Sequence, residues 1–450
     1  MGRLFGTDGI RGVANTELTC ELALDVGRAA AAVLAEGYRR RPVFVVGTDT
    51  RTSAGMLASA LMAGLCSVGA DVMYLQVIST PAVAYLMTKY KADAGIMISA
   101  SHNPSEYNGI KIFGGNGYKL PDALEERIED IVLNHLPIAD HLVGDAVGTV
   151  TYCNDCAKDY IAHLRSTVPN CLEGLHVGVD CANGSASVTA RELFESLGAE
   201  VHIINDRPNG SNINNNCGST HMEELIKTVR DLHLDCGVAF DGDADRCLAV
   251  DENGALIDGD MIMAVCALDM KKRGKLNHDA VVGTIMTNFG FGKFCEENGL
   301  KFVATKVGDR FVLEEMLMED YSFGGEQSGH VIFRDFATTG DGQLTAIQLL
   351  SMLKREGCPL SALTTVMRRY PQTIINVKVT NDSKRLFYTD TEISRVMNQA
   401  KDILGTDGRI VVRPSGTEPL IRVMAEGSNE DIIAQQANMV AQVIQNRLGV

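Results

Sequence analysis

Residues 43–72 read VFVVGTDTRTSAGMLASALMAGLCSVGADV, an apolar run followed by a polar turn, a helix-like segment and a second apolar run. The run Val43–Val46 predicts a buried β-strand, and the segment near residues 54–67 predicts an amphipathic helix. The turn at Gly69 leads into a second strand that starts near Asp71. A strand, a helix and a strand in this order form a βαβ unit with parallel strands.

The same order of elements returns twice. Val177–Val179 predicts a strand, residues 186–197 a helix, and Gly198-Ala199-Glu200-Val201 nearly copies the end of the first unit. A third unit begins at Ala280–Val282 and closes with Lys301–Val303. Three such units predict three similar α/β domains, with helices on the faces of mixed or parallel sheets and sites at the carboxyl ends of strands.

The end of the chain, from about Pro371, has a different pattern. A final helix follows strand-like apolar positions at Ile374, Ile375, Val377, Val379, Ile410–Val412 and Ile421–Val423. This pattern predicts a small α+β domain. At 450 residues the chain exceeds the roughly 250–300 residues that one core supports. We therefore predict four domains, at residues 1–150, 151–255, 256–370 and 371–450.

The formal net charge of −16 excludes two classes of partner. Nucleic acids and anionic membranes both require a large positive field on the protein, so neither is expected to bind. The sequence contains no run of 18 apolar residues, which is about the length needed to span a bilayer. Met1–Gly6 lacks the apolar core of a signal peptide. We therefore predict a cytoplasmic protein.

Twelve cysteines are scattered without the spacing of a disulfide framework, which predicts reduced thiols. Cys153 and Cys156 form a CxxC pair, a spacing also found in zinc and redox sites. Both cysteines, however, share helical spacing with the apolar residues Ala157, Tyr160, Ile161 and Leu164. We therefore predict that the pair lies on the core-facing side of a helix.

A serine-containing loop follows the strand-like run Ala94–Ile98. It reads Ser99-Ala100-Ser101-His102-Asn103-Pro104, in which the small alanine and the turn-forming Asn-Pro pair expose the hydroxyl of Ser101. The side chains of His102 and Lys111 could handle a proton or the charge of a phosphate. Ordinary turns also contain serine, asparagine and proline, so the loop alone does not establish a nucleophile.

Three aspartates at alternate positions follow the apolar strand Gly237–Phe240, namely Asp241, Asp243 and Asp245. Oxygen-only ligands in such a group suit a hard cation such as Mg²⁺. An EF-hand is excluded, because its sixth position requires glycine and carries Arg246 here. Two other interpretations stay open: a phosphatase with Asp241 as its nucleophile, and a solvated acidic turn.

The loop Gly324–His330 combines a carboxylate, an amide, a hydroxyl and an imidazole. Glu326 and Ser328 could hydrogen-bond neighbouring sugar hydroxyls, which is a source of discrimination once the groups are desolvated. His330 could carry a proton or could have a structural role only.

A second loop, Arg413–Pro419, has the composition of a phosphate cradle. Its guanidinium, hydroxyl and backbone N–H donors belong to Arg413, Ser415, Gly416, Thr417 and the nearby Arg422. A plain surface turn remains the alternative. The opening Gly6–Gly12 and the segment Gly47–Ser53 are weak motifs, and the chain lacks the pattern GxxxxGK[ST], so a kinase is disfavoured.

Taken in this order along the whole chain, these loops resemble those of the α-D-phosphohexomutase family. The resemblance implies three similar mixed α/β domains and a smaller C-terminal α+β domain around a central cleft. It also implies that Ser101 carries a transferable phosphate, and that this phosphoserine binds one Mg²⁺ per chain together with Asp241, Asp243 and Asp245.

The resemblance implies roles for further residues. The catalytic residues would be Ser101, His102, Lys111, Arg246 and His330, with the proton carriers among His102, Lys111 and His330. The substrate-binding residues would be Thr7, Arg11, Glu326, Ser328, Arg413, Ser415, Gly416, Thr417 and Arg422. Those from Arg413 onward would grip the phosphate that is not reacting, and Lys306 or Arg310 could orient the substrate.

Three motifs narrow the resemblance. The serine loop Ile98–Pro104, the opening Phe5–Gly12 and the loop Glu326–His330, which contains Gln327, are similar to those of bacterial members that act on glucosamine phosphates. This implies interconversion of glucosamine 6-phosphate and glucosamine 1-phosphate through phospho-Ser101 and glucosamine 1,6-bisphosphate. That bisphosphate or another donor would prime Ser101, and the product would supply amino-sugar nucleotides for peptidoglycan.

Two alternatives remain at this stage. A phosphoglucomutase or phosphomannomutase of the same family would carry out the same chemistry on another sugar. A non-catalytic sensor would bind the phosphosugar without transferring phosphate. The sequence also leaves a homodimer open.

Overall fold

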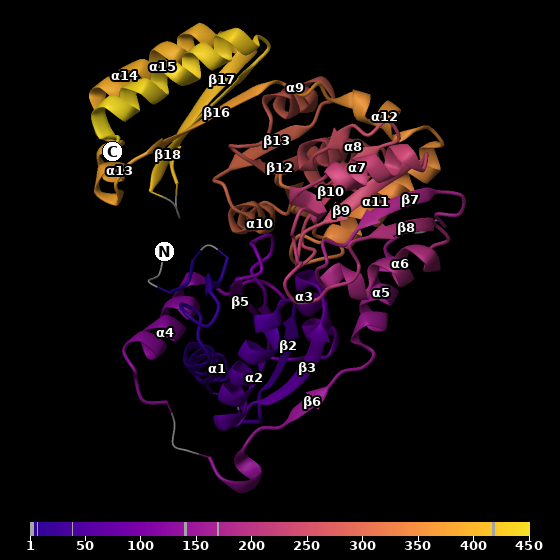
Figure 1. Cartoon of the computed structure of the whole chain (residues 1–450), viewed down its shortest axis with the longest axis vertical. Helices are drawn as coiled ribbons and strands as arrows, with labels where there is room; N and C mark the ends of the chain where they lie inside the picture. Colours follow the sequence, from indigo (N-terminus) through magenta and orange to yellow (C-terminus); the bar gives the residue numbers. More distant parts are fainter. Residues whose placement is uncertain (1–3, 7, 38, 139–141, 169–170, 416–418) are drawn as a thin grey trace. The chain divides into compact units, whose positions relative to one another are not determined.

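The computed structural model describes residues 4–6, 8–37, 39–138, 142–168, 171–415 and 419–450 (Figure 1). The chain divides into two compact units. The first comprises Met1–Val282 and Gly308–Thr365, and the second comprises Gly283–Val307 and Val366–Val450.

The first sheet of the first unit has the strand order β1-β5-β4-β2-β3-β6. Its strands are β1 (Ile10–Val13), β2 (Val43–Thr48), β3 (Asp71–Val77), β4 (Ala94–Ile98), β5 (Tyr107–Gly114) and β6 (Val150–Tyr152). Strands β2, β3, β4 and β6 are parallel, whereas β5 runs antiparallel to β4 and β1. The predicted βαβ unit is confirmed, because β2 and β3 pair in parallel.

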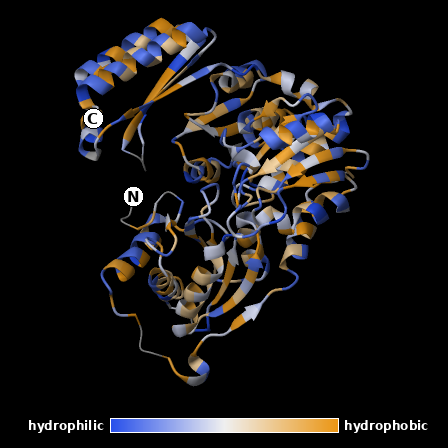
Figure 2. Ribbon diagram, in the orientation of Figure 1, coloured by the Kyte–Doolittle hydropathy of each residue, from blue (hydrophilic) through white to orange (hydrophobic). Residues whose placement is uncertain are grey.

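Helices cover both faces of this sheet. The helices α1 (Cys20–Leu34), α2 (Thr52–Ser67) and α4 (Asp122–Leu133) share one apolar core with the sheet, and α3 (Thr80–Lys89) contacts β2 and β4. Phe44 and Val46 belong to that core, whereas the equally buried Val45 faces the other side, as the alternation of a strand requires. Burial on both faces explains why β2 is apolar from Val43 to Val46 (Figure 2).

The second sheet has the order β11-β10-β9-β7-β8. Its strands are β7 (His176–Asp180), β8 (Glu200–Ile204), β9 (Cys236–Phe240), β10 (Cys247–Asp251) and β11 (Leu256–Ile257). Strand β7 pairs in parallel with β8 and β9, and β10 is antiparallel to β9 and β11. The helices of this region are α5 (Cys156–Ser166), α6 (Ala190–Ser196) and α7 (Glu223–Asp231).

Two predicted helices differ from the structure. Segment 186–197 is a 3₁₀ turn, Ser185–Val188, followed by α6, because Thr189 leaves helical geometry (φ −121°, ψ −30°) and its hydroxyl hydrogen-bonds Gln343. The prediction that Cys153 and Cys156 share a helix is wrong, since α5 begins at Cys156. The Sγ of Cys153 instead lies 3.5 Å from the hydroxyl of Tyr90.

In the rest of the first unit, β12 (Ala280–Thr284) pairs in parallel with β14 (Phe323–Gly325), which is antiparallel to β15 (Val331–Phe333). The helices here are α8 (Gly259–Lys272), α10 (Asp309–Met318), α11 (Gly342–Glu356) and α12 (Leu360–Leu363). Asp258 and Asp341 cap α8 and α11, because their carboxylates accept hydrogen bonds from the first free backbone N–H groups.

The second unit contains α9 (Phe289–Glu297), β13 (Lys301–Thr305) and the C-terminal segment. Its antiparallel sheet has the order β16-β18-β17. The elements are β16 (Gln372–Lys378), β17 (Gly408–Pro414), β18 (Leu420–Gly427), α13 (Asn381–Leu386), α14 (Thr391–Leu404) and α15 (Glu430–Leu448). Residues of α14, α15 and the sheet form one apolar core, which confirms the predicted α+β domain.

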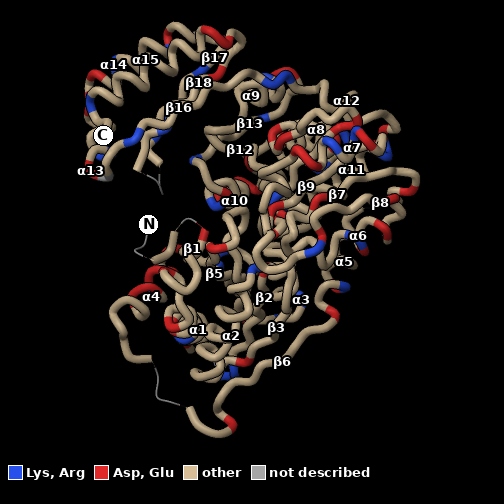
Figure 3. Tube along the Cα trace, in the orientation of Figure 1, with Lys and Arg blue, Asp and Glu red and all other residues tan. Residues whose placement is uncertain are grey.

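Short 3₁₀ helices complete the described elements, at Gly144–Ala146, Ser185–Val188, Gly218–Thr220, Asn277–Asp279, Thr364–Val366 and Gly405–Asp407. Acidic and basic residues are interspersed along the helices of both units (Figure 3). Within the described ranges, no helix has both the length and the apolar character needed to cross a membrane.

Helices α1 and α2 pack through two glycines. A Cβ placed on Gly27 would lie 2.3 Å from the carbonyl oxygen of Leu61, and one on Gly64 would lie 2.1 Å from that of Leu24. These distances leave no room for a methyl group, so the two backbones approach more closely than a side chain would allow.

We expect Gly64→Ala to lower the free energy of unfolding of the first unit by about 1–3 kcal/mol, because the clash outweighs the gain in helix propensity. The matched control is Gly55→Ala on the same helix, where a Cβ would meet nothing within 4 Å. The control should be neutral or up to about 1 kcal/mol more stable. Urea unfolding of both variants tests this, and equal effects would contradict it.

Candidate active site

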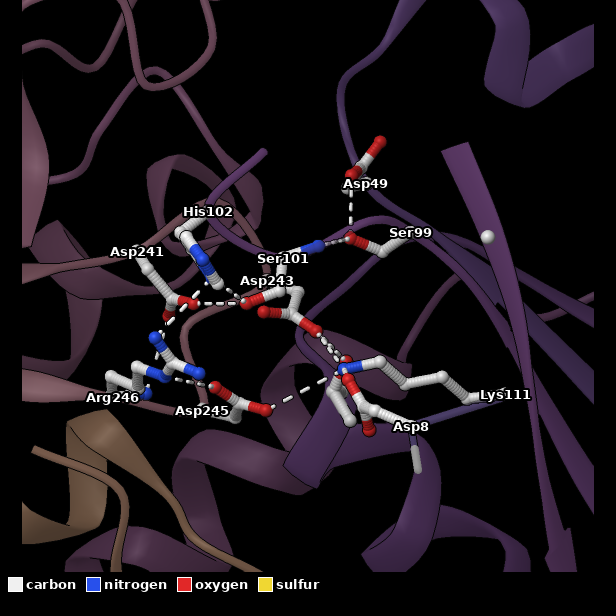
Figure 4. A network of polar contacts seen from close by, with 12 residues as sticks. Asp8, Asp49, Ser99, Ser101, His102, Lys111, Asp241, Asp243, Asp245 and Arg246 are labelled. Atoms are coloured by element: carbon white, nitrogen blue, oxygen red, sulfur yellow. Dashed lines mark hydrogen bonds and ion pairs between the residues drawn. The ribbon is translucent and has the colours of Figure 1, made fainter. Parts of the chain in front are cut away.

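Ser101 lies in the loop between β4 and β5 and is buried, with 1% of the residue exposed. Its hydroxyl donates a hydrogen bond to Asp241 Oδ2 at 2.6 Å, and His102 Nδ1 lies 3.3 Å from Ser101 Oγ (Figure 4). Its φ of 52° is left-handed, which is uncommon for a residue with a side chain. The structure thus brings the serine loop and the aspartate cluster together across 140 residues of sequence.

The cluster of Asp241, Asp243 and Asp245 follows β9, and the three residues are buried, at 1%, 0% and 5% exposure. One carboxylate oxygen of each lies within 4.8 Å of the others. Among the described residues, Oδ1 of Asp243 and Oδ1 of Asp245 have no hydrogen-bond partner. Buried carboxylate oxygens without a donor are costly unless a cation binds them, so the cluster fits a hard divalent metal.

The pKa values of two members reflect this crowding. Burial raises the pKa of Asp241 well above its ordinary value, and the charges of Asp245 and Asp243 raise it further. Burial acts in the same direction on Asp245, but Lys111 and His330 outweigh it and lower the pKa of that carboxyl. The raised pKa of Asp241 shows that negative charge is crowded here, so an additional cation would be stabilised at this place.

Lys111, on β5, supplies a buried cation to the cluster. Its Nζ lies 2.8 Å from Asp243 Oδ2, 3.1 Å from Asp8 Oδ2 and 3.6 Å from Asp245 Oδ2. Burial alone would lower the pKa of Lys111, but these carboxylates reverse the shift and raise the pKa above its ordinary value. The side chain is therefore charged at neutral pH in this arrangement.

Lys119 extends the charge network beyond Asp8. Its Nζ lies 2.6 Å from Asp8 Oδ1 and 2.6 Å from Asp309 Oδ2. Asp309 lies 3.5 Å from His330 Nε2, and His330 Nδ1 lies 3.6 Å from Asp245 Oδ2. Acidic and basic side chains thus alternate around a closed ring, which we call the charge ring: Asp245, Lys111, Asp8, Lys119, Asp309 and His330.

His102 lies between Ser101 and Arg246. Arg246 Nη1 donates to His102 Nδ1 at 3.3 Å, and the Arg246 backbone N–H donates to Asp241 Oδ1 at 3.2 Å. Burial, together with the positive charges of Arg246 and Arg11, lowers the pKa of His102 to about 4. His102 is therefore neutral at pH 7 and can accept a proton there.

The loop between β14 and β15 carries Glu326 and Ser328. The Gly308 N–H donates to Glu326 Oε1 at 3.0 Å, and burial, with the charge of Asp309, raises the pKa of Glu326. The hydroxyl oxygen of Ser328 is buried and has no hydrogen-bond partner within the described part of the chain. This loop therefore offers a ligand both a carboxylate and a hydroxyl.

His330, at the end of the same loop, is 3% exposed. The Gly340 N–H donates to His330 Nε2 at 3.0 Å, so the proton of the neutral imidazole lies on Nδ1, the atom that faces Asp245. Arg310, in contrast, is held in ion pairs with Asp122 and Glu314.

The predicted phosphate loop lies in the second unit. Arg413 on β17 is directly opposite Arg422 on β18, and Arg422 Nε donates to Asn376 Oδ1 at 3.0 Å. Lys384 Nζ donates to the carbonyl of Ser415 at 2.8 Å. Like charges opposite each other on neighbouring strands are unfavourable unless an anion lies between them. Thr7, Gly416 and Thr417 lie outside the described residues.

Comparison with known proteins decides the family. Models of the phosphoglucomutase/phosphomannomutase domains match along the chain: domain I at residues 2–137, domain II at 158–254, domain III at 258–370 and the C-terminal domain at 374–443. The chain belongs to the phosphoglucomutase/phosphomannomutase family. The predicted fold of three α/β domains and a C-terminal α+β domain, and the predicted phosphohexomutase class, are thereby confirmed.

Individual members of the phosphoglucomutase/phosphomannomutase family match over the full length. Phosphoglucosamine mutase of Clostridium novyi is 51% identical over 447 residues, 99% of each chain. That of Ruminiclostridium cellulolyticum is 51% identical over 448 residues, 100% of each chain. A solved family protein from Burkholderia thailandensis has a TM-score of 0.84 at 24% identity, covering 99% of this chain and 97% of its own.

Sequence reasoning missed several groups around the site. Asp8 stood in the glycine-rich opening, and Asp309 stood beside the positions considered for substrate orientation, but neither was singled out. Lys119 and Asn214 carried no sequence signal, because their roles arise from partners more than 100 residues away. Arg51 lay in a motif that is weak by itself.

We expect the folded protein to bind one divalent cation per chain, Mg²⁺ or Mn²⁺, at the aspartate cluster, and to gain stability as the cation concentration rises. Asp243→Asn should weaken binding by at least about tenfold, because it removes one of three charged ligands. The control is Asp231→Asn at an exposed position on α7. Titration calorimetry measures both, and equal affinities would refute the assignment.

We expect the imidazole of His102 to stay neutral until the pH falls to about 4. This folded pKa lies below the unfolded value of about 6.5, so the unfolded state takes up the proton first as the pH falls. His102 therefore costs stability increasingly between about pH 6.5 and pH 4. The His102→Gln variant should lose less stability over that interval than the parent.

Unfolding free energies measured against pH, with imidazole titration by NMR, test this expectation. The control is His135→Gln at an exposed position, which should follow the parent curve. A midpoint for His102 near 6.5 would contradict the expectation.

Proposed function

We propose that the protein interconverts glucosamine 6-phosphate and glucosamine 1-phosphate through phospho-Ser101 and glucosamine 1,6-bisphosphate. The observation that carries the proposal is the buried contact of the Ser101 hydroxyl with Asp241, at the edge of a carboxylate cluster suited to a metal. The choice of glucosamine is supported by full-length relatives at about 50% identity that are named phosphoglucosamine mutase.

The proposed metal is Mg²⁺, one per chain, held by Asp241, Asp243 and Asp245 together with phospho-Ser101. When bound, it would neutralise charge on the oxygens of the transferring phosphoryl group. Among the described residues, Oδ1 of Asp243 and Oδ1 of Asp245 accept no hydrogen bond, although Arg246 Nε lies 3.9 Å from the latter, so both oxygens could coordinate the cation. Hard carboxylate oxygens are the donors that this cation prefers.

In the forward half-reaction, the bond from phosphorus to Ser101 Oγ breaks and a bond from phosphorus to the sugar O1 forms. The O1 proton passes to a base, for which His102 and His330 are the candidates, and Ser101 Oγ takes up a proton as it leaves. His102 is neutral at pH 7, as the role of the base requires. Lys111 is the candidate donor of the proton that Ser101 Oγ takes up, because its ammonium group is charged at neutral pH. In the second half-reaction the bond from phosphorus to O6 breaks and a bond from the same phosphorus to Ser101 Oγ forms. The Ser101 hydroxyl gives up its proton and O6 gains one.

Burial of Ser101 is central to this scheme. A phosphoserine beside a metal would hydrolyse if water could reach it, and the residue is 1% exposed. Lys111 places positive charge beside Asp243, and Arg246 places it beside His102, whose Nδ1 lies 3.3 Å from Ser101 Oγ. Transfer between fixed groups then depends on positioning and charge stabilisation, without consumption of a nucleotide.

Other residues have proposed binding roles. Glu326 and Ser328 would bind sugar hydroxyls, because both present polar atoms in one loop. Thr7 and Arg11 would also contact the substrate. The non-reacting phosphate would bind in the second unit at Arg413, Ser415, Gly416, Thr417 and Arg422. The opposed pair Arg413 and Arg422 favours an anion there.

We also propose the biological setting inferred from the sequence. The protein would work in the cytoplasm, with a phosphosugar as its partner and without nucleic acid or membrane. Its four domains would end near residues 150, 255, 370 and 450, and a homodimer is compatible with the proposal. Glucosamine 1,6-bisphosphate or another donor would prime Ser101.

The decisive experiment incubates the protein with Mg²⁺, a trace of glucosamine 1,6-bisphosphate and glucosamine 6-phosphate, and follows the product by phosphorus NMR. We expect glucosamine 1-phosphate, and a loss of at least about 1,000-fold in kcat for Ser101→Ala, because the phosphate carrier is gone. Ser105→Ala, in the same loop, is the matched control and should stay active.

Other outcomes assign other functions. Brisk conversion of glucose or mannose 6-phosphate, without conversion of the glucosamine ester, would make the protein a phosphoglucomutase or phosphomannomutase. Release of inorganic phosphate that survives Ser101→Ala would indicate a hydrolase with Asp241 as nucleophile. Binding without turnover would indicate a phosphosugar sensor.

A further inference from the structure

The carbonyl groups of the serine loop converge on one buried guanidinium. Arg51 Nη2 donates to the carbonyls of Ser101 at 3.0 Å and Asn103 at 2.8 Å, and Arg51 Nη1 donates to the carbonyl of Pro104. The side chain of Arg51 is 0% exposed. A single side chain therefore holds three carbonyls of a four-residue turn.

Arg51 is itself held by a chain of hydrogen bonds that runs through Asp49 and Ser99 back to Ser101. Its Nε donates to Asp49 Oδ2 at 2.9 Å, and the same oxygen accepts a hydrogen bond from the Ser99 hydroxyl at 2.6 Å. The Ser99 hydroxyl oxygen accepts the Ser101 N–H at 3.0 Å (Figure 4). Both the N–H and the carbonyl of Ser101 are thus tied to one buried ion pair.

Asn214, in the loop after β8, approaches the same turn from a different segment. Its Nδ2 donates to the carbonyls of Ser101 at 2.9 Å and Asn103 at 3.1 Å. These two carbonyls therefore receive donors from both Arg51 and Asn214. We call Arg51, Asp49, Ser99 and Asn214 the loop clamp.

The clamp explains the backbone of Ser101. A left-handed conformation in a residue with a side chain persists only where its surroundings impose it. Here the carbonyls of the turn must all point toward Arg51, and this leaves the Ser101 side chain directed at Asp241. Lysine could not replace the guanidinium, because one ammonium group cannot reach three carbonyls and Asp49 in fixed directions.

We propose that Arg51 is a positioning residue for phosphoryl transfer, which keeps Ser101 Oγ in its transfer position through the loop carbonyls. This inference rests on the proposed function, since it assigns Ser101 as the phosphate carrier. In the contacts of the described residues, Arg51 touches neither the aspartate cluster nor the loop Gly324–His330. Its loss should therefore lower kcat while KM and cation affinity change little.

The first test is Arg51→Lys, which keeps the positive charge beside Asp49. We expect kcat to fall by about 100-fold, the effect of misplacing a reacting group by roughly 1 Å, with KM within about threefold of the parent. The control is Arg355→Lys, because Arg355 pairs with Asp269 away from the site and its change should leave kcat unaltered.

A second test uses chemical rescue and a neutral variant. Added guanidinium should restore part of the kcat of Arg51→Ala but none of that of Ser101→Ala. Arg51→Ala leaves Asp49 buried and unpaired, and this variant could fail to fold for that reason. In that case Asn214→Ala is the second variant, because it removes donors to the same carbonyls without leaving a buried charge unpaired. It should lower kcat by about tenfold, with KM unchanged.

Hydrogen exchange of the peptide that contains Ser99–Pro104 gives a readout independent of catalysis. The amide of Ser101 should exchange faster in Arg51→Lys and at the parent rate in Arg355→Lys. Absence of mutase activity in the parent would defeat the proposed function, whereas the exchange measurement would still test the clamp. Parent-like exchange with parent-like kcat in Arg51→Lys, or a raised KM with unaltered kcat, would overturn the inference.

Discussion

The burial of negative charge organises the first unit. Asp241, Asp243 and Asp245 are removed from water at the end of a buried strand, where uncompensated carboxylates would be too costly to keep. Cations and N–H donors must therefore surround them, and the ammonium group of Lys111 and the Nδ1–H of His330 come from segments far away in the sequence. Strand β5, the loop that carries the aspartate cluster and the loop Gly324–His330 consequently have to lie close together.

The charge ring shows how far this requirement extends. Lys111 needs Asp8 as a second partner, Asp8 needs Lys119, and Lys119 ends on Asp309 beside His330. Each charged side chain of the ring has at least one neighbour of opposite sign, which is the condition under which buried ion pairs persist. These ion pairs hold the side chains of the site in place relative to one another, and preorganisation of this kind is what phosphoryl transfer requires.

The serine loop is held by different means. Its own carbonyls, which have no place in a sheet, are satisfied by Arg51 and Asn214, so the loop has a defined conformation although it lies outside the sheet. Ion pairs hold the aspartate cluster in place, whereas hydrogen bonds to the backbone carbonyls of the serine loop set the direction of the Ser101 hydroxyl. In the second unit, the opposed side chains of Arg413 and Arg422 are both positive, and a bound anion would balance their charge as cations balance the aspartates in the first unit.

The sequence by itself determined the βαβ units, the C-terminal α+β domain and the loops that carry the chemistry, because apolar periodicity and turn residues act between near neighbours. It placed Cys153 in a helix and joined residues 186–197 into one, since spacing alone does not reveal where tertiary contacts end a helix. Only the tertiary structure decided the charge ring and the loop clamp. Lys111 meets Asp243 across 132 residues and Arg51 meets Ser101 across 50, and contacts at such separations depend on how the chain packs.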